Sequence, residues 1–182
     1  AGSQGARHFS IVADPVNPNI LYVGGDRQPG SAGTAPNDTF ANGPNSIGAT
    51  NYTGRLFRGD ATAAAGAQWV HLTHSDVLGA PGGGTASSSA PHADSREMVF
   101  DANGNLIEVD DGGIYRRTSP SDNTGDWFSI NGNLQVFEFH NINYDTNSDI
   151  LFGGAQDNGT PQQLSTGSLV WSAVSTADGG DV

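Results

Sequence analysis

One stretch of the sequence decides the fold: Glu97-Met98-Val99-Phe100-Asp101-Ala102-Asn103-Gly104-Asn105-Leu106-Ile107-Glu108-Val109. It consists of two β-rich runs joined by turn-forming residues, and Asn-Gly between two such runs is a strong signal for a β-hairpin. The first run ends at Asp101, and Trp127 follows that aspartate after 26 residues. We therefore expect an antiparallel hairpin whose sheet continues towards the tryptophan.

The same template occurs twice more along the chain. Asp145 precedes Trp171 by the same interval, and Asp14 precedes Trp69 by a longer interval that contains an insertion. Self-similarity at a fixed period identifies the structural unit of a repeat protein. The sequence thus predicts three repeats, at about residues 8–74, 91–131 and 134–182.

Each repeat carries two further short strands. Phe57 and Tyr115 lie in matching Gly-led runs and precede their tryptophans by equal intervals, and a fourth strand begins at each tryptophan. Four short antiparallel strands in a unit of about 40–50 residues are typical of a propeller blade. We predict an all-β fold, in which residues 1–182 form a single β-propeller segment of about three four-stranded antiparallel blades. A β-sandwich or a β-solenoid is the competing architecture.

Two insertions interrupt the template, at residues 28–51 and 75–90, and their Gly-, Pro-, Asn- and Ser-rich composition is typical of exposed loops. Three blades do not close a ring, because propellers need about four to eight. The chain also stops directly after a Gly pair, at Asp181-Val182. We therefore expect a segment of a larger secreted or cell-surface protein, with further blades supplied by the same chain or by other copies.

The composition limits the partners. The 182 residues include 26 glycines and only 7 lysines and arginines, and the formal net charge is −12. This acidity argues against nucleic acid or an anionic membrane, since both attract basic surfaces. No apolar run approaches the ~20 residues of a membrane span, and the absence of cysteine excludes disulfides and thiolate zinc sites. Neutral carbohydrate, protein and divalent cations remain as partners.

The turn before Trp127 resembles the Asp box of sialidase-type propellers, Ser/Thr-x-Asp-x-Gly-x-x-Trp. Asp122 stands one place late in this pattern, and the gap between Gly125 and Trp127 is shortened. In that family the aspartate bonds the backbone of the turn and the tryptophan packs between sheets. The resemblance implies structural roles for one aspartate, one glycine and three tryptophans, namely Asp122, Gly125, Trp69, Trp127 and Trp171.

A second resemblance covers about residues 8–182 and concerns the order of short motifs. His92-Ala93-Asp94, Asp110-Asp111-Gly112-Gly113-Ile114-Tyr115-Arg116, Gln156-Asp157-Asn158-Gly159 and Asp178-Gly179-Gly180-Asp181 follow one another as in BNR-repeat propellers, the sortilin-like and xyloglucanase-like proteins. In the xyloglucanase-like glycoside hydrolases, an aspartate two places before Gly-Gly-x-Tyr-Arg is a catalytic carboxylate, and Asp110 matches that position. The resemblance therefore implies that Asp110 is catalytic. The alternative is that it caps the end of a strand.

Acidic residues at strand ends also suggest a metal site. A propeller would gather these ends near one face, and Ca²⁺ takes six to eight hard oxygen ligands of this kind. We therefore predict calcium at Asp94, Asp111, Asp157, Asp178 and Asp181, with Asp110 beside them.

Two functions remain open. The favoured one is a recognition or structural propeller, stabilised by calcium, that binds carbohydrate or protein. The other is a fragment of a glycoside hydrolase that acts on a polysaccharide through paired Asp carboxylates, in which Asp157, Asp178, Asp181 or another blade supplies the partner of Asp110. Whether the protein is an enzyme is not decided by the sequence.

Overall fold

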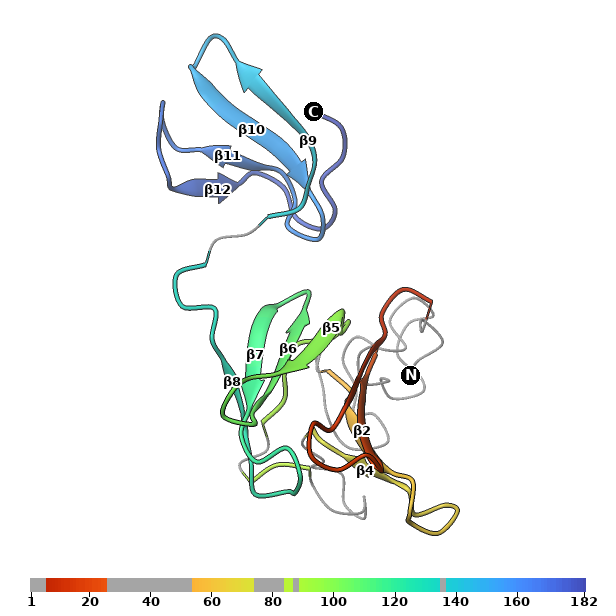
Figure 1. The fold of residues 1–182 in the computed structure, drawn as a ribbon. Helices are drawn as coiled ribbons and strands as arrows, with labels where there is room; N and C mark the ends of the chain where they lie inside the picture. Colours follow the sequence, from red (N-terminus) through yellow and green to blue (C-terminus); the bar gives the residue numbers. More distant parts are fainter. Residues whose placement is uncertain (1–5, 26–53, 74–83, 87–88, 135–136) are drawn as a thin grey trace. The chain divides into compact units, whose positions relative to one another are not determined.

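A computed structural model describes residues 6–25, 54–73, 84–86, 89–134 and 137–182. These residues form three four-stranded antiparallel sheets (Figure 1), which confirms the all-β prediction. The strands are β1 (Ser10–Ala13), β2 (Ile20–Gly24), β3 (Phe57–Asp60), β4 (Trp69–His71), β5 (Glu97–Phe100), β6 (Leu106–Asp110), β7 (Gly113–Arg117), β8 (Trp127–Ser129), β9 (Phe139–Asp145), β10 (Ile150–Ala155), β11 (Pro161–Gln163) and β12 (Trp171–Ala173).

Each sheet follows the chain in simple up-and-down order: β1-β2-β3-β4, β5-β6-β7-β8 and β9-β10-β11-β12. The chain divides into two compact units, Ala1–Gly132 with the first two sheets and Asn133–Val182 with the third. The predicted insertion at 28–51 lies outside the described residues, and so do residues 75–83 and 87–88 of the second insertion.

The first hairpin of each sheet is held by the aspartate that ends its first strand. Asp101 Oδ1 accepts hydrogen bonds from the backbone N–H groups of Asn103 and Asn105, both at 2.8 Å. Asp14 and Asp145 accept backbone hydrogen bonds in the same way, from Asn17 and Asn147 among others. An Asp side chain that bonds the backbone a few residues on mimics a turn and stabilises it locally. The three repeats therefore share an Asp-bonded turn as well as the pattern of strands.

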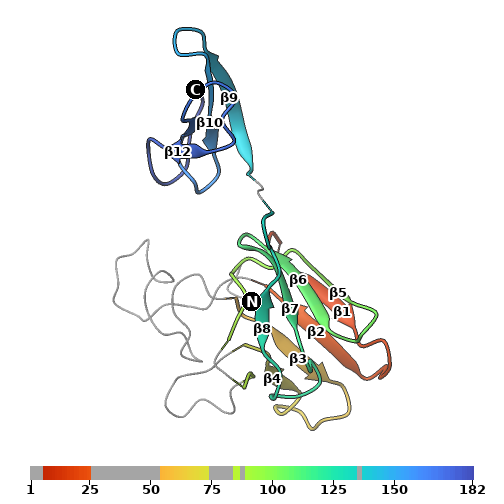
Figure 2. The ribbon, with the colours of Figure 1, turned by 90° about the vertical axis from the view of Figure 1, so that its left-hand side faces the viewer.

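The core of the first unit lies between its two sheets. It contains buried side chains from both sheets and from the segments that follow β2 and β4: Ile20, Tyr22, Leu56, Leu72, Met98, Leu106 and Trp127. The rings of Tyr22 on β2 and Phe100 on β5 meet edge to face at 5.3 Å. The first strands of the two sheets, β1 and β5, lie side by side (Figure 2). The two sheets are therefore layered face to face.

Cross-strand neighbours share a face of a sheet, and this assigns the faces in the first unit. In the second sheet the row Phe100, Leu106, Arg117 and Trp127 faces the core. The opposite face exposes Val99 and Phe128.

The third sheet has the same organisation within its own unit. The side chain of Gln163 on β11 accepts a hydrogen bond from Leu151 N at 2.8 Å and donates one to Ser168 O at 3.0 Å. Trp171 is half-buried, with its ring 6.0 Å from that of Phe139. The face that carries Trp171 exposes Tyr144 and other apolar side chains.

Candidate functional site

The least expected group in the core of the first unit is a carboxyl. Side chains alternate along a strand, so Leu106, Glu108 and Asp110 on β6 project to the same face. The register places Glu108 between Met98 on β5 and Tyr115 on β7. Glu108 is 0% exposed, and Asp110 at the end of the strand is half-buried. Two acids therefore lie side by side on the face of the sheet that is covered by its neighbour.

The carboxyl pair is hydrogen-bonded within itself. Asp110 Oδ1 accepts the backbone N–H of Gly112 at 2.7 Å. The Glu108 and Asp110 carboxyls hydrogen-bond each other, and the Ser95 side chain hydrogen-bonds Glu108. Both oxygens of Glu108 and Asp110 Oδ2 are buried. Burying two acids side by side is costly for folding even with these bonds.

The pKa values of both acids are raised, and burial is the main cause in each case. Burial raises the pKa of Glu108, and the adjacent Asp110 carboxylate raises it further. Burial also raises the pKa of Asp110, although the hydrogen bond from Glu108, then the Gly112 N–H and His92, favour its charged form. Two carboxylates in one low-dielectric site cannot both ionise easily. The pair therefore keeps a proton near neutral pH, and such a carboxyl can serve as an acid or as a hydrogen-bond donor.

The structure thus gives the predicted residue Asp110 a partner that the sequence reasoning missed. The sequence analysis names Asp157, Asp178, Asp181 or another blade as the source of the partner, whereas Glu108 lies two places before Asp110 on the same strand. The signal was present, because Glu108 is an acid at an inward position of the alternating run that begins at Leu106. A charged residue is almost never fully buried without a partner.

The residues predicted to hold calcium have separate partners in the structure. His8 Nδ1 lies 3.8 Å from Asp94 Oδ1, and Arg96 donates to Asp111 Oδ1 from Nε at 3.0 Å and from Nη2 at 2.8 Å. Within the described part of the chain, no three His, Asp or Glu side chains are grouped so that they could share a metal ion.

In the third sheet, Asp157 and Asp178 are brought together. Asp178 Oδ1 accepts hydrogen bonds from Gln156 Nε2 at 2.7 Å and from the backbone N–H of Asp157 at 2.9 Å. Asp181 is exposed near the end of the chain. The Asp178 carboxylate therefore links the segment at Gln156 and Asp157 to the segment after β12. Calcium at the five predicted positions stays a prediction.

The residues of the Asp-box-like turn have local roles. Asp122 Oδ1 accepts the backbone N–H of Thr124 at 2.8 Å and its hydroxyl at 2.6 Å. A Cβ added to Gly125 would lie 1.7 Å from the carbonyl oxygen of Thr118, so only glycine fits there. Trp127 is 5% exposed, and its Nε1 donates to the carbonyl of Leu72 at 2.8 Å. This turn therefore fixes the tryptophan against the first sheet.

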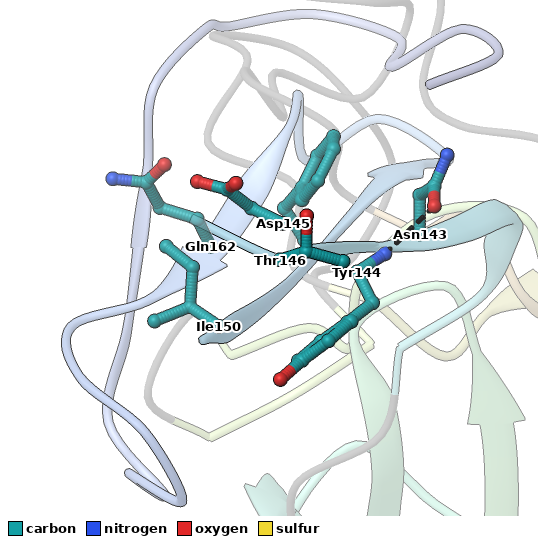
Figure 3. A pocket seen from close by; sticks show the side chains of 7 residues that line it. Asn143, Tyr144, Asp145, Thr146, Ile150 and Gln162 are labelled. Atoms are coloured by element: carbon teal, nitrogen blue, oxygen red, sulfur yellow. Dashed lines mark hydrogen bonds between the residues drawn. The ribbon is translucent and has the colours of Figure 1, made fainter. Parts of the chain in front are cut away.

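An open pocket of about 410 Å³ lies on the sheet of the second unit (Figure 3). Its lining combines polar and apolar side chains from β9 to β11: Asn143, Tyr144, Asp145, Thr146, Ile150, Phe152 and Gln162. The acid of this group, Asp145, already accepts the backbone N–H of Asn147 at 2.9 Å. The carboxyl pair on β6 is therefore the stronger candidate site.

Comparison with models of protein families, with curated proteins and with solved structures found no match to this chain. Among the described residues there is no helix with the length and apolar character needed to cross a membrane. The fold and the carboxyl pair are therefore the features of this chain that indicate its function.

Proposed function

We propose that the chain is a segment of a BNR/Asp-box-like β-propeller in which successive sheets stack as the first two do. Two observations support this arrangement. The first strands of the two sheets, β1 and β5, lie side by side, as the innermost strands of neighbouring blades would around an axis. Trp127, at the repeat position of the Asp-box tryptophan, is buried against the preceding sheet.

Further blades complete the ring in this proposal. The face of the first sheet that carries Trp69 leaves Phe9, Ile11 and Trp69 exposed, and in a ring a preceding blade covers it. The covering blade comes from a longer chain or from another copy. Sedimentation of the protein tests this, because Trp69→Asp should prevent assembly of copies, or should lower the melting temperature of a longer protein. An unchanged mass and melting temperature at every length of chain would contradict it.

We further propose that this propeller is a secreted or cell-surface recognition protein that binds carbohydrate at the strand end around Asp110. The observation that carries the proposal is the buried carboxyl pair on β6, because two buried acids with raised pKa values weaken folding and are therefore typical of function. Asp110 at the end of β6 and Tyr115 on the adjacent strand β7 are both only partly buried, and an acid beside an aromatic residue is the combination that binds sugars. The net charge of −12 favours such a neutral ligand.

Calorimetric titration of the chain with xyloglucan and β-glucan oligosaccharides tests this. Asp110→Asn should weaken binding at least about tenfold, since it removes a charged acceptor worth roughly 1.5–3 kcal/mol. Glu97→Gln is the matched control, because Glu97 is an exposed acid on the opposite face of the same sheet. Equal binding by the two variants would remove Asp110 from the site, and binding to protein but not to glycans would identify a protein ligand.

A second candidate function is glycoside hydrolysis, and the raised pKa of Asp110 favours it. The reaction needs one protonated carboxyl as the acid and a second carboxylate as the base or nucleophile. Glu108 is fully buried, so it would be a positioning residue that hydrogen-bonds Asp110, while burial raises the pKa of Asp110. Another carboxylate would face the sugar. Release of reducing sugar from xyloglucan, lost in Asp110→Asn while binding persists, would support hydrolysis. Binding without release by the unsubstituted protein would exclude it.

A further inference from the structure

The pocket of the second unit lies on a sheet face whose counterpart in the first unit belongs to the core. Phe152 on β10 pairs with Asn143 on β9 and with Gln162 on β11, and all three line the pocket (Figure 3). Tyr22 on β2 holds the position of Phe152, because each lies two residues after the isoleucine that begins its strand. Tyr22 is 0% exposed between the two sheets of its unit, whereas Phe152 is half-buried in an open pocket.

The segment that follows the third sheet takes the path by which the second sheet begins on the first. Ser95, just before β5, donates its backbone N–H to the carbonyl of Gly25 at 2.9 Å. Gly179, after β12, donates its backbone N–H to the carbonyl of Ala155 at 2.8 Å. Gly25 and Ala155 each lie three residues after the matched aromatic residue of their sheet, so the two hydrogen bonds are equivalent.

The second strand of each sheet is approached closely at the same position. A Cβ on Gly24 would lie 2.5 Å from Ser95 Oγ, and a Cβ on Gly154 would lie 1.8 Å from the carbonyl oxygen of Gly180. A glycine within a strand is typical of a place where another segment of backbone approaches. In the first unit the approaching segment goes on into β5, the first strand of the covering sheet.

The fourth strands end in matching ways as well. The backbone N–H of Leu72 donates to Leu56 O, and that of Val174 donates to Thr160 O, both at 2.9 Å. Leu72 is 1% exposed, and its carbonyl accepts the indole N–H of Trp127 from the covering sheet. Val174 is 58% exposed. Val174 therefore matches Leu72 in its backbone bond and differs from it in burial.

We propose that the pocket face of the third sheet is the docking surface of a further four-stranded sheet of the same template. This sheet begins at residues 179–182, as the second sheet begins at residues 95–98. Its inner face is apolar and carries a tryptophan at the start of the fourth strand, because such a face covers Tyr22 in the first unit. The inference rests on the proposed stacking of successive sheets, and it interprets the pocket as an open interface between sheets.

An extended chain tests the proposal. A second copy of residues 99–132 is joined after Val182, so that it continues residues 179–182 in the register in which it continues residues 95–98. Docking should slow amide hydrogen exchange in β10 about tenfold or more, because exchange from a central strand follows the free energy of opening. An extension with the same residues in scrambled order is the control and should leave this exchange unchanged. Equal protection by the two extensions would overturn the proposal.

The chain without an extension provides a second test. Tyr22→Thr removes a ring from a covered face, whereas Phe152→Thr removes one from an uncovered face. Tyr22→Thr should therefore lower the melting temperature at least about threefold more. Comparable losses would overturn the proposal, and so would copies whose association in sedimentation is broken by Phe152→Thr, because a second copy would then cover this face. The stacking proposal fails separately, since Trp69→Asp concerns what covers the first sheet.

Discussion

The two sheets of the first unit follow one template, yet their tryptophans have opposite surroundings. Trp127 is 5% exposed, whereas Trp69 at the same repeat position is 54% exposed. Each begins a fourth strand and is paired with the third, Trp127 with Arg117 and Trp69 with Gly59. The local register is therefore the same, and the burial is different.

The two tryptophans differ in burial because only one of them lies on a sheet face that is covered by another sheet. The row that ends at Trp127 faces the first sheet, where Leu72 O accepts the indole N–H. The equivalent row of the first sheet, Leu21, Gly59 and Trp69, lies on the face opposite Tyr22 and so points away from the second sheet. In repeat proteins, stability is the sum of unit and interface contributions. Whether the tryptophan of a repeat is buried or exposed therefore depends on whether a neighbouring sheet covers it, and not on the sheet to which it belongs.

Truncation of the two tryptophans should have the most unequal effect. Trp127→Ala should lower the free energy of unfolding by about 3–5 kcal/mol, since it opens a cavity in the core and removes the bond to Leu72 O. Trp69→Ala should cost about 1 kcal/mol or less, because half of its ring is already in water. Urea unfolding of the full chain followed by far-UV circular dichroism measures both. Equal losses would mean that the first sheet is covered by an assembled copy.

The third strands should also differ, because the buried arginine exists in one sheet only. Arg117 is 0% exposed and donates to the backbone carbonyls of Leu72, Gly84 and Asp122. Arg117→Met keeps most of the volume but leaves carbonyls without donors, which should cost about 2–3 kcal/mol. Arg116→Met is the matched control, since Arg116 is exposed on the other face, and it should change stability by about 0.5 kcal/mol or less. Comparable losses in the same urea assay would refute a special role for Arg117.

Features that depend on neighbours in the chain could be predicted from the sequence. The hairpin at Asp101 has its own signals, because its alternation, its Asn-Gly pair and the aspartate that bonds the turn all lie within a few residues. Equal spacings then extended this pattern to the third and fourth strands of all three sheets. Contacts between residues far apart in sequence were not encoded in any pattern of this kind.

The missing information concerned partners across sheets. Arg117 looks like an ordinary strand surface residue, yet it is buried because carbonyls from the preceding sheet and its loop surround it. Glu108 could be suspected from its inward position, but its complete burial and its contacts with Asp110 and Ser95 depend on the packing of the folded chain. The sequence therefore predicted one residue of the candidate site, Asp110, whereas its partner Glu108 was identified only from the structure.

The smallest effects should come from the turns before the tryptophans, and there the two sheets should agree. Asp60 accepts the backbone N–H of Thr62 at 2.8 Å and its hydroxyl at 2.6 Å, and Asp122 makes the same two bonds with Thr124 at the same distances. In both, the hydroxyl and then the backbone N–H lower the pKa of the carboxyl below its usual value of 3.8.

Because the folded pKa lies below the unfolded one, this stabilisation is present above about pH 4 and is lost as the pH falls through the folded value. Thr62→Val and Thr124→Val should each move the pKa of the partner aspartate back towards 3.8, by similar amounts, as measured by carbon-detected NMR titration between pH 2 and 6. Both carboxylates are solvent-exposed, so neither variant should approach the loss caused by Trp127→Ala. A shift confined to Asp122 would show that the turn depends on the sheet that covers its tryptophan, whereas equal shifts would show that the template folds locally and that only stacking makes the two sheets different.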